Sequence, residues 1–137
     1  MAVINNLPMR GVKAELLWSN PNTSSDFASQ TINVNKNLSD YEQVFILTKG
    51  HKANNDAQSL LCELRKDVTS YNKMLWIGWY NTSSGTQYVN YRQYRVTTQT
   101  NIWFGGGAYI YTDGGTATGN GYCVPIAIYG VKKKINK

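Results

Sequence analysis

The chain has 137 residues, which is enough for one ordinary domain and too few for two. Charged residues make up 16 % of it, while Tyr occurs ten times and Trp four times. The net charge is +6, but Lys132, Lys133, Lys134 and Lys137 all lie in the last six residues, so the body carries only about +2. The other cations are scattered, which does not favour a nucleic-acid-binding protein. No apolar run approaches the roughly 20 residues that span a membrane.

Short apolar and β-branched runs alternate with clusters of Asn, Gly, Ser and Asp along the chain. The runs favour strands and the clusters favour turns. Strands are expected over 13–18, 29–35, 42–49, 59–66, 73–80, 87–98, 101–111 and 121–131. This spacing predicts an all-β chain that forms an antiparallel, jelly-roll-like β-sandwich of about eight strands. We expect one domain over 1–137, with a lead-in over 1–12 and a basic tail over 132–137.

The segment 104–122 holds seven of the twelve glycines. A phosphate-binding loop needs its glycines between a strand and a helix, whereas these lie between expected strands. Gly114 and Gly115 follow an Asp, which is typical of a hairpin turn with positive φ. The run Gly105 to Gly107 predicts a bulge or a close approach of another backbone or a ligand.

The two strands 73–80 and 87–98 have contrasting faces. In 73–80, both faces are apolar, with Leu75, Ile77 and Trp79 on one and Met74, Trp76, Gly78 and Tyr80 on the other. This predicts either a central strand covered on both sides or a contact between chains. In 87–98, one face alternates rings with hydrogen-bonding side chains, namely Tyr88, Asn90, Arg92 and Tyr94. Such a face is typical of a polar recognition surface, and a solvated sheet face with cross-strand tyrosine packing is the simpler alternative.

Residues suited to catalysis are sparse. His51 is the only histidine and is expected in a solvated turn between strands. Cys62 and Cys123 lie in separate apolar runs, where free buried thiols are expected, and no spacing matches a metal site. The closest acidic pair, Asp40 and Glu42, lies at a turn-to-strand junction. We therefore predict no catalytic residue, no metal and no cofactor, and a protein that is not an enzyme.

Several segments together resemble a known family. They are 17–21 (LWSNP), 27–32 (FASQTI) and 41–46 (YEQVFI), then Arg95, Val96, Ile102, Phe104 and Gly105 in an arginine-led hairpin, then Pro125, Ile128, Tyr129 and Gly130 in the closing strand. In this order they resemble the C-terminal domains of tail-fibre and minor tail proteins from phages of Gram-positive bacteria. The resemblance implies an all-β head domain at the tip of a phage tail, in the virion. It further implies a homotrimer that contacts other tail proteins and binds the host cell surface.

Receptor binding of this kind predicts contacts to a cell-wall saccharide. Aromatic faces stack on pyranose rings, and amide or guanidinium groups bind hydroxyls. The candidate contacts are Asn90, Arg92 and Tyr94, with Trp79, Trp103 and Tyr111 as stacking rings. Burial in a core or a chain contact is the alternative for each Trp. The positive charge would also favour a phosphate-bearing, teichoic-acid-like polymer.

Two other functions remain open. A structural virion or baseplate protein would bury its aromatic surfaces against other chains. A cell-wall hydrolase would place two carboxylates within about 5 to 9.5 Å of each other in a groove.

Overall fold

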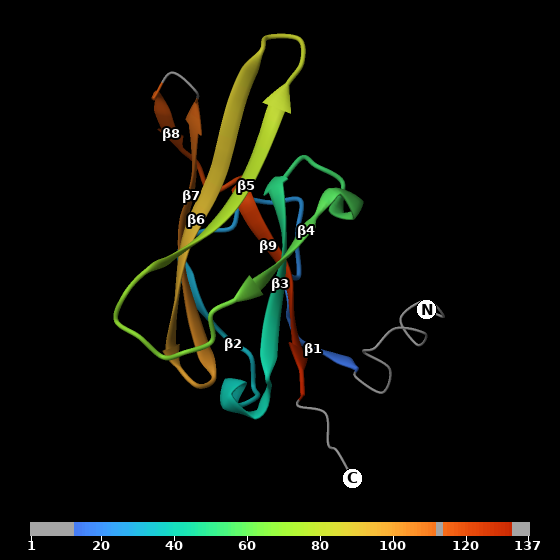
Figure 1. The fold of residues 1–137 in the computed structure, drawn as a ribbon, viewed down its shortest axis with the longest axis vertical. Helices are drawn as coiled ribbons and strands as arrows, with labels where there is room; N and C mark the ends of the chain where they lie inside the picture. The colour runs from blue at the N-terminus through green and yellow to red at the C-terminus, as the bar shows by residue number, and fades with distance from the viewer. Residues whose placement is uncertain (1–12, 112–113, 133–137) are drawn as a thin grey trace.

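The computed structural model describes residues 13–111 and 114–132, which form two packed antiparallel sheets (Figure 1). The first sheet has the order β1 (Ala14–Ser19), β9 (Tyr122–Val131), β3 (Gln43–His51) and β4 (Leu60–Leu64). The second has the order β2 (Gln30–Asn33), β7 (Asn101–Tyr111), β6 (Thr86–Thr98) and β5 (Lys73–Asn81), with β8 (Thr116–Thr118) also paired to β7. The predicted antiparallel β-sandwich is confirmed. The lead-in over 1–12 and the tail beyond Lys132 lie outside the described residues.

Each of the eight expected strands is present in the described residues, with ends that shift by a few positions. The ninth strand, β8, is only three residues long, too short for an alternating pattern, and it depends on pairing with β7. The turn before β4 contains a short 3-10 helix, η2 (Asp56–Gln58), capped by the Asn55 side chain. Another, η1 (Leu38–Asp40), precedes β3. No helix in the described ranges is long and apolar enough to cross a membrane.

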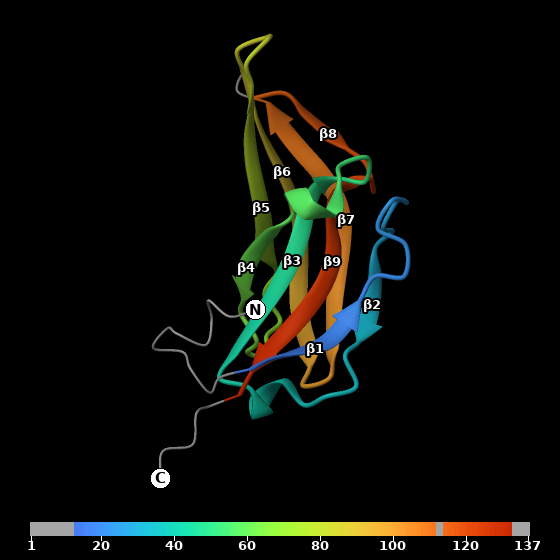
Figure 2. The same cartoon turned by 90° about the vertical axis from the view of Figure 1, so that its right-hand side faces the viewer.

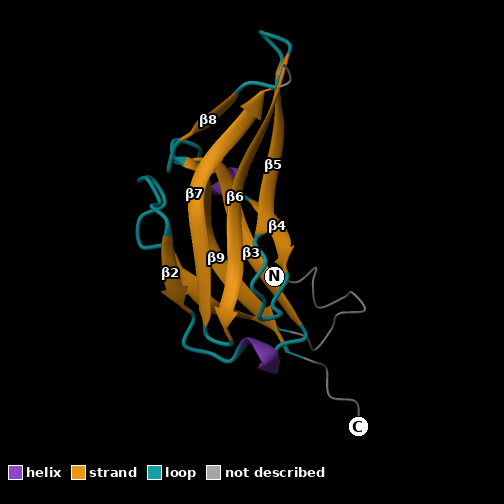
Figure 3. Ribbon diagram, turned by 90° about the vertical axis from the view of Figure 1, so that its left-hand side faces the viewer, coloured by secondary structure: helices purple, strands orange, loops and turns teal. Residues whose placement is uncertain are grey.

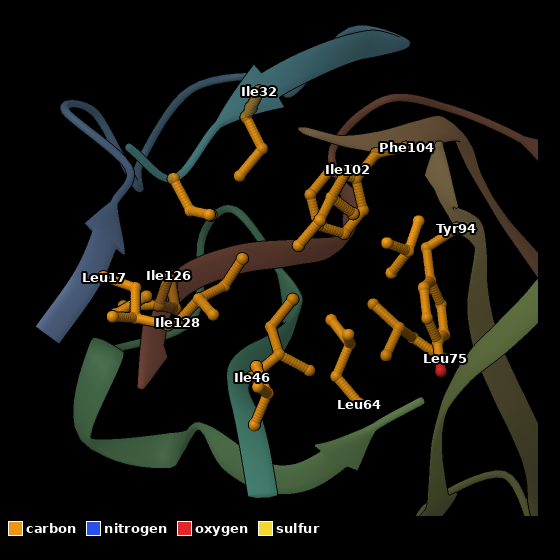
Figure 4. Packing of buried hydrophobic residues seen from close by; sticks show 14 of the residues in the cluster. Leu17, Ile32, Ile46, Leu64, Leu75, Tyr94, Ile102, Phe104, Ile126 and Ile128 are labelled. Atoms are coloured by element: carbon orange, nitrogen blue, oxygen red, sulfur yellow. The ribbon is translucent and has the colours of Figure 1, made fainter. Parts of the chain in front are cut away.

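The core lies between the two sheets and is mainly aliphatic (Figure 4). Alternation along each strand directs Ile46 and Ile128 from the first sheet toward Leu75 and Phe104 from the second. Cys123 belongs to this core, while Cys62 is partly buried, and both are free thiols. Apolar side chains therefore make up most of the interior, which also holds the buried polar residues Thr48, Lys49, Asn90 and Arg92.

The second sheet is longer than the first at one end (Figures 1 and 2). The first sheet ends where His51 of β3 pairs with Tyr122 of β9. The hairpin of β5 and β6 continues past this level, and Trp79 pairs there with Tyr88, which pairs in turn with Tyr111. The inner face of the second sheet therefore has no opposing sheet at this end.

The glycine-rich segment confirms the expected bulge. The register shifts between Arg92 and Tyr94 of β6, so Gly105 and Gly106 of β7 lie opposite the single residue Gln93 and β7 has one extra residue there. At this point the edge of β7 changes partner from β2 to β8, which lie along the same edge (Figure 3). A Cβ on Gly107 would clash with the carbonyl oxygens of Tyr122 and Gly119, so a larger residue fits only if this backbone moves. Gly114 has a φ of +87°, as the hairpin prediction requires.

Candidate functional site

The face of β6 that carries Asn90, Arg92 and Tyr94 points into the sandwich. All three side chains are buried, and Arg92 is 0 % exposed. The prediction of a solvent-facing recognition surface is therefore wrong at these positions. The alternation of rings and hydrogen-bonding groups is the same whether the polar atoms meet water or buried main-chain carbonyls, so the sequence pattern could not distinguish the two.

Arg92 holds together three separate segments of main chain, at Phe27, at Gly105 and over 120–123. Its Nε donates to the Cys123 carbonyl at 2.8 Å, and Nη1 donates to the carbonyls of Phe27 (2.9 Å) and Gly105 (2.6 Å). Nη2 donates to the carbonyls of Tyr122 (2.8 Å) and Asn120 (3.2 Å). These bonds use all five guanidinium donors. Burial lowers the pKa of Arg92 to about 10, which leaves it protonated at neutral pH.

The Arg92 contacts also stabilise an unfavourable backbone conformation. Cys123 has a φ of 49°, in the left-handed region that costs a non-glycine residue about 1–2 kcal/mol. Hydrogen bonds to the carbonyls of Cys123 and Tyr122 fix this conformation. Arg92 is therefore a structural residue that positions the start of β9.

Tyr94 is likewise structural. Its hydroxyl accepts a hydrogen bond from the Arg65 backbone N–H at 3.0 Å, and burial raises its pKa. Trp103 lies on the opposite, outer face of the second sheet, where the Arg95 guanidinium stands 5.1 Å from its ring centre. Trp103 is therefore separated by the sheet from Trp79 and Tyr111.

The remaining candidates, Trp79 and Tyr111, lie at the end of the sandwich where the second sheet extends beyond the first, which we call the open end. A cleft of about 590 Å³ is found there. We call it the aromatic cleft. Its described lining residues are Gly50, His51, Asn54, Gln58, Leu60, Ile77, Gly78, Trp79, Asn90 and Tyr122. Two of the six predicted site residues, Trp79 and Asn90, thus meet in one cleft. Trp79 is 46 % exposed there, and the Asn90 side-chain nitrogen donates to the Gly50 carbonyl at 2.9 Å.

Aromatic rings extend from the cleft along the inner face of the second sheet. Trp79 stacks on Tyr88 with ring centres 4.3 Å apart and planes inclined by 10°. The Tyr111 ring lies 5.2 Å from Tyr88, and its hydroxyl bonds that of Tyr109 at 2.5 Å. This bond is the main reason that the pKa of Tyr111 rises to about 12. Tyr111 therefore packs against Tyr88, the ring on which Trp79 stacks. Tyr111 itself is not among the described residues that line the cleft.

His51 is the end of β3 rather than part of a solvated turn, which corrects the sequence prediction. Its ring is half-buried against Tyr122, with ring centres 5.0 Å apart. Burial, reinforced by the charge of Lys52, lowers its pKa, so the ring is neutral at pH 7. Nδ1 accepts a hydrogen bond from the Ala53 N–H at 3.1 Å. The neutral ring therefore carries its proton on Nε2.

The loop over 52–59 that borders the cleft is fastened by two ion pairs. Lys49 is buried, and its Nζ donates to Asp56 at 2.7 Å and to the Asn54 carbonyl at 2.9 Å. Lys52 pairs with Asp26 at 2.8 Å. Hydrogen bonds from Lys49, and then from the Thr23 hydroxyl, lower the pKa of Asp56. The polar sequence of this loop predicts a turn but does not indicate that the turn folds over the end of the sheet. His51, Asn54 and Gln58 are therefore not predicted as site residues from the sequence.

Two further hollows lie elsewhere. One of about 440 Å³ is on the outer face beside the β7 bulge, with Tyr91 and Asn120 in its lining. Another of about 340 Å³ is lined in part by Glu42, Glu63 and Asp67. A backbone hydrogen bond lowers the pKa of Asp67, which is opposite to what a general acid needs. Among the described residues, no group of three or more His, Cys, Asp or Glu is placed to hold a metal.

The cleft combines a partly exposed indole with amide, imidazole and phenol groups, an arrangement that can stack on a ring and bind hydroxyls. Comparisons with protein-family models, with curated proteins and with solved structures found no match to this chain.

Proposed function

We propose that the protein is a non-enzymatic receptor-binding module, of the kind found at the tip of a phage tail, that binds a saccharide of a Gram-positive cell wall. The observation that carries the proposal is the aromatic cleft, where the half-exposed Trp79 lies beside the side chains of His51, Asn54, Gln58 and Asn90. An indole face suits the apolar face of a pyranose ring, and the neighbouring groups suit its hydroxyls. The candidate site therefore keeps Asn90 and Trp79, and Arg92 and Tyr94 are no longer candidate contacts.

The position of the cleft supports this role. β1 begins beside the end of β9, where Ala14 pairs with Val131, and the cleft lies at the other end of β9, near Tyr122. A virion that holds the domain near Ala14 or Val131 would leave the cleft facing outward. In the proposed homotrimer three clefts would act together, so weak single sites would give useful avidity.

A second candidate is a structural virion protein that joins chains. It is favoured by the outer face of β5, where Trp76 is 57 % exposed and Tyr80 is 55 % exposed. β5 is an edge strand, so the expectation of a central strand is wrong, and a chain contact is the alternative that this apolar face supports.

The test compares two tryptophans on opposite faces of one sheet. Trp79→Ala should weaken binding to intact Gram-positive cells and extracted wall polysaccharide by about tenfold or more, because the stacking ring is lost. Trp103→Ala is the matched control and should stay within about twofold of the parent protein. Thermal unfolding would verify that both variants are folded, and light scattering would give the oligomeric state.

Equal losses in the two folded variants would contradict the cleft as the site. Absence of binding across a broad panel of strains would instead favour the structural candidate. Turnover of wall polysaccharide that is abolished by Glu42→Gln or Glu63→Gln would support a hydrolase.

A further inference from the structure

The aromatic cleft differs in charge from the protein as a whole. The chain carries a net charge of +6, yet none of the ten described residues that line the cleft is ionised at neutral pH. His51 is the only titratable group among them apart from the Tyr122 phenol, and its pKa is lowered by burial. A ligand in the cleft therefore meets dipoles rather than a fixed charge.

The cations whose charges act on His51 are paired with carboxylates. The two lysines that lower its pKa are Lys52 and Lys49. Lys52 forms an ion pair with Asp26 at 2.8 Å, and Lys49 forms one with Asp56 at 2.7 Å. Each ammonium is thus compensated by a carboxylate before any ligand arrives. The field of the pairs falls off faster with distance than that of free charges.

The hydrogen bonds within the cleft leave both donors and acceptors available to a ligand. Nε2–H of His51 is a donor, because Nδ1 accepts from Ala53. The Gln58 side-chain oxygen accepts from the Asn55 N–H at 3.0 Å, so its amide nitrogen is the donor that remains. The Asn90 nitrogen is used by Gly50, so its oxygen is the acceptor that remains. Neutral donors and acceptors beside an indole match the hydroxyl groups of a sugar.

From this geometry we propose that the aromatic cleft selects an uncharged sugar unit and not a phosphate-bearing one. The inference rests on the proposed function and narrows its ligand. An anionic group entering the cleft would lose its hydration without gaining a cation in exchange, which is unfavourable. For the cleft, this proposal differs from the expectation that the net positive charge would favour a phosphate-bearing polymer.

Salt dependence of polysaccharide binding tests the inference. The probes are extracted wall polysaccharide, with poly(glycerol phosphate) as a competing polyanion, and the proteins are the parent chain, Trp79→Ala and the control Trp103→Ala. We expect binding that requires Trp79, that changes by less than about twofold between roughly 50 and 500 mM NaCl, and that excess poly(glycerol phosphate) does not displace.

Binding that requires Trp79 but falls about tenfold or more with salt, or that poly(glycerol phosphate) displaces, would overturn the inference and leave the proposed function standing. Polysaccharide binding that is the same in Trp79→Ala and the parent would overturn the cleft as the site and the inference with it.

Discussion

The inner face of the second sheet is packed differently at the two ends of the sandwich. At the closed end, Val96 and Ile102 of the second sheet pack against the first sheet and are fully buried. At the open end, Trp79, Tyr88 and Tyr111 continue the face with no sheet opposite. The rings there cover one another and leave indole surface exposed. The inner face of β6 is thus buried in the sandwich along most of the strand, and near the start of β6 it is covered only by other aromatic rings.

Arg92 lies between the two ends, and its replacement is expected to have the largest effect on the stability of the fold. Arg92→Ala would remove the guanidinium donors from five carbonyls, in three buried and two partly buried hydrogen bonds, while the Asn120 carbonyl would keep a backbone donor, the Phe27 N–H. The substitution should destabilise the fold by about 3–5 kcal/mol or prevent folding. Arg92→Lys should recover only part of this, because an ammonium has three donors. Urea unfolding measures both, and a wild-type midpoint for Arg92→Ala would show that the carbonyl network contributes little.

A matched pair of ring truncations compares the two ends directly. Phe104→Ala, at the closed end, should cost about 3–5 kcal/mol because the ring is fully buried. Tyr111→Ala, at the open end, should cost at most about 2 kcal/mol, since the ring is only partly covered and packs against other rings. Chemical unfolding of the two variants side by side gives both values. Similar losses would mean that the aromatic end is as tightly packed as the core.

At the β7 bulge, the effect of adding a single methyl group can be tested. Gly107→Ala would place Cβ within 2.5 Å of the carbonyls of Tyr122 and Gly119, so the β8–β9 turn must move. We expect a loss of about 1–3 kcal/mol. Gly114→Ala, with nothing within 4 Å of its Cβ but a φ of +87°, is the control for backbone strain alone and should cost less. Equal thermal shifts in the two variants would contradict the steric account.

The loop at the cleft should respond to acid. The pKa of Asp56 is lower in the folded state than its usual value, chiefly through the hydrogen bond from Lys49. Its stabilising contribution is therefore complete above a pH of about 4 and is lost as pH falls through the lowered pKa. Thermal midpoints measured from about pH 2 to 6 should decline less steeply in Asp56→Asn than in the parent. Parallel pH profiles would show that the pair does not stabilise the loop.

The smallest effect on stability is expected on the outer face of β5. Trp76→Ser should change the free energy of unfolding by no more than about 0.5 kcal/mol in an isolated chain, because the ring is exposed. A fall in oligomer mass on light scattering would assign this face to contacts between chains. An unchanged mass in an oligomeric protein would place that contact elsewhere.

The strands and the bulge follow from local sequence, whereas the site does not. Turn clusters and β-branched runs fix the strand positions, and the run Gly105 to Gly107 marks the bulge, because these depend on the backbone preferences of neighbouring residues. Which face of β6 is buried depends on the sheet that packs against it. The pattern of β6 therefore predicts a surface contact at Arg92, whereas its five acceptors come from segments distant in sequence. His51 joins Trp79 only through the fold of a polar loop.

The most direct test follows the side-chain N–H signals of the four tryptophans by NMR while extracted wall polysaccharide is added. Trp79 lines the aromatic cleft, Trp18 packs against the core, and Trp76 and Trp103 lie on the outer face of the second sheet. The account predicts that the Trp79 signal shifts or broadens in a saturable manner, while those of Trp18 and Trp103 stay in place. Saturable shifts at Trp103 with none at Trp79 would contradict it.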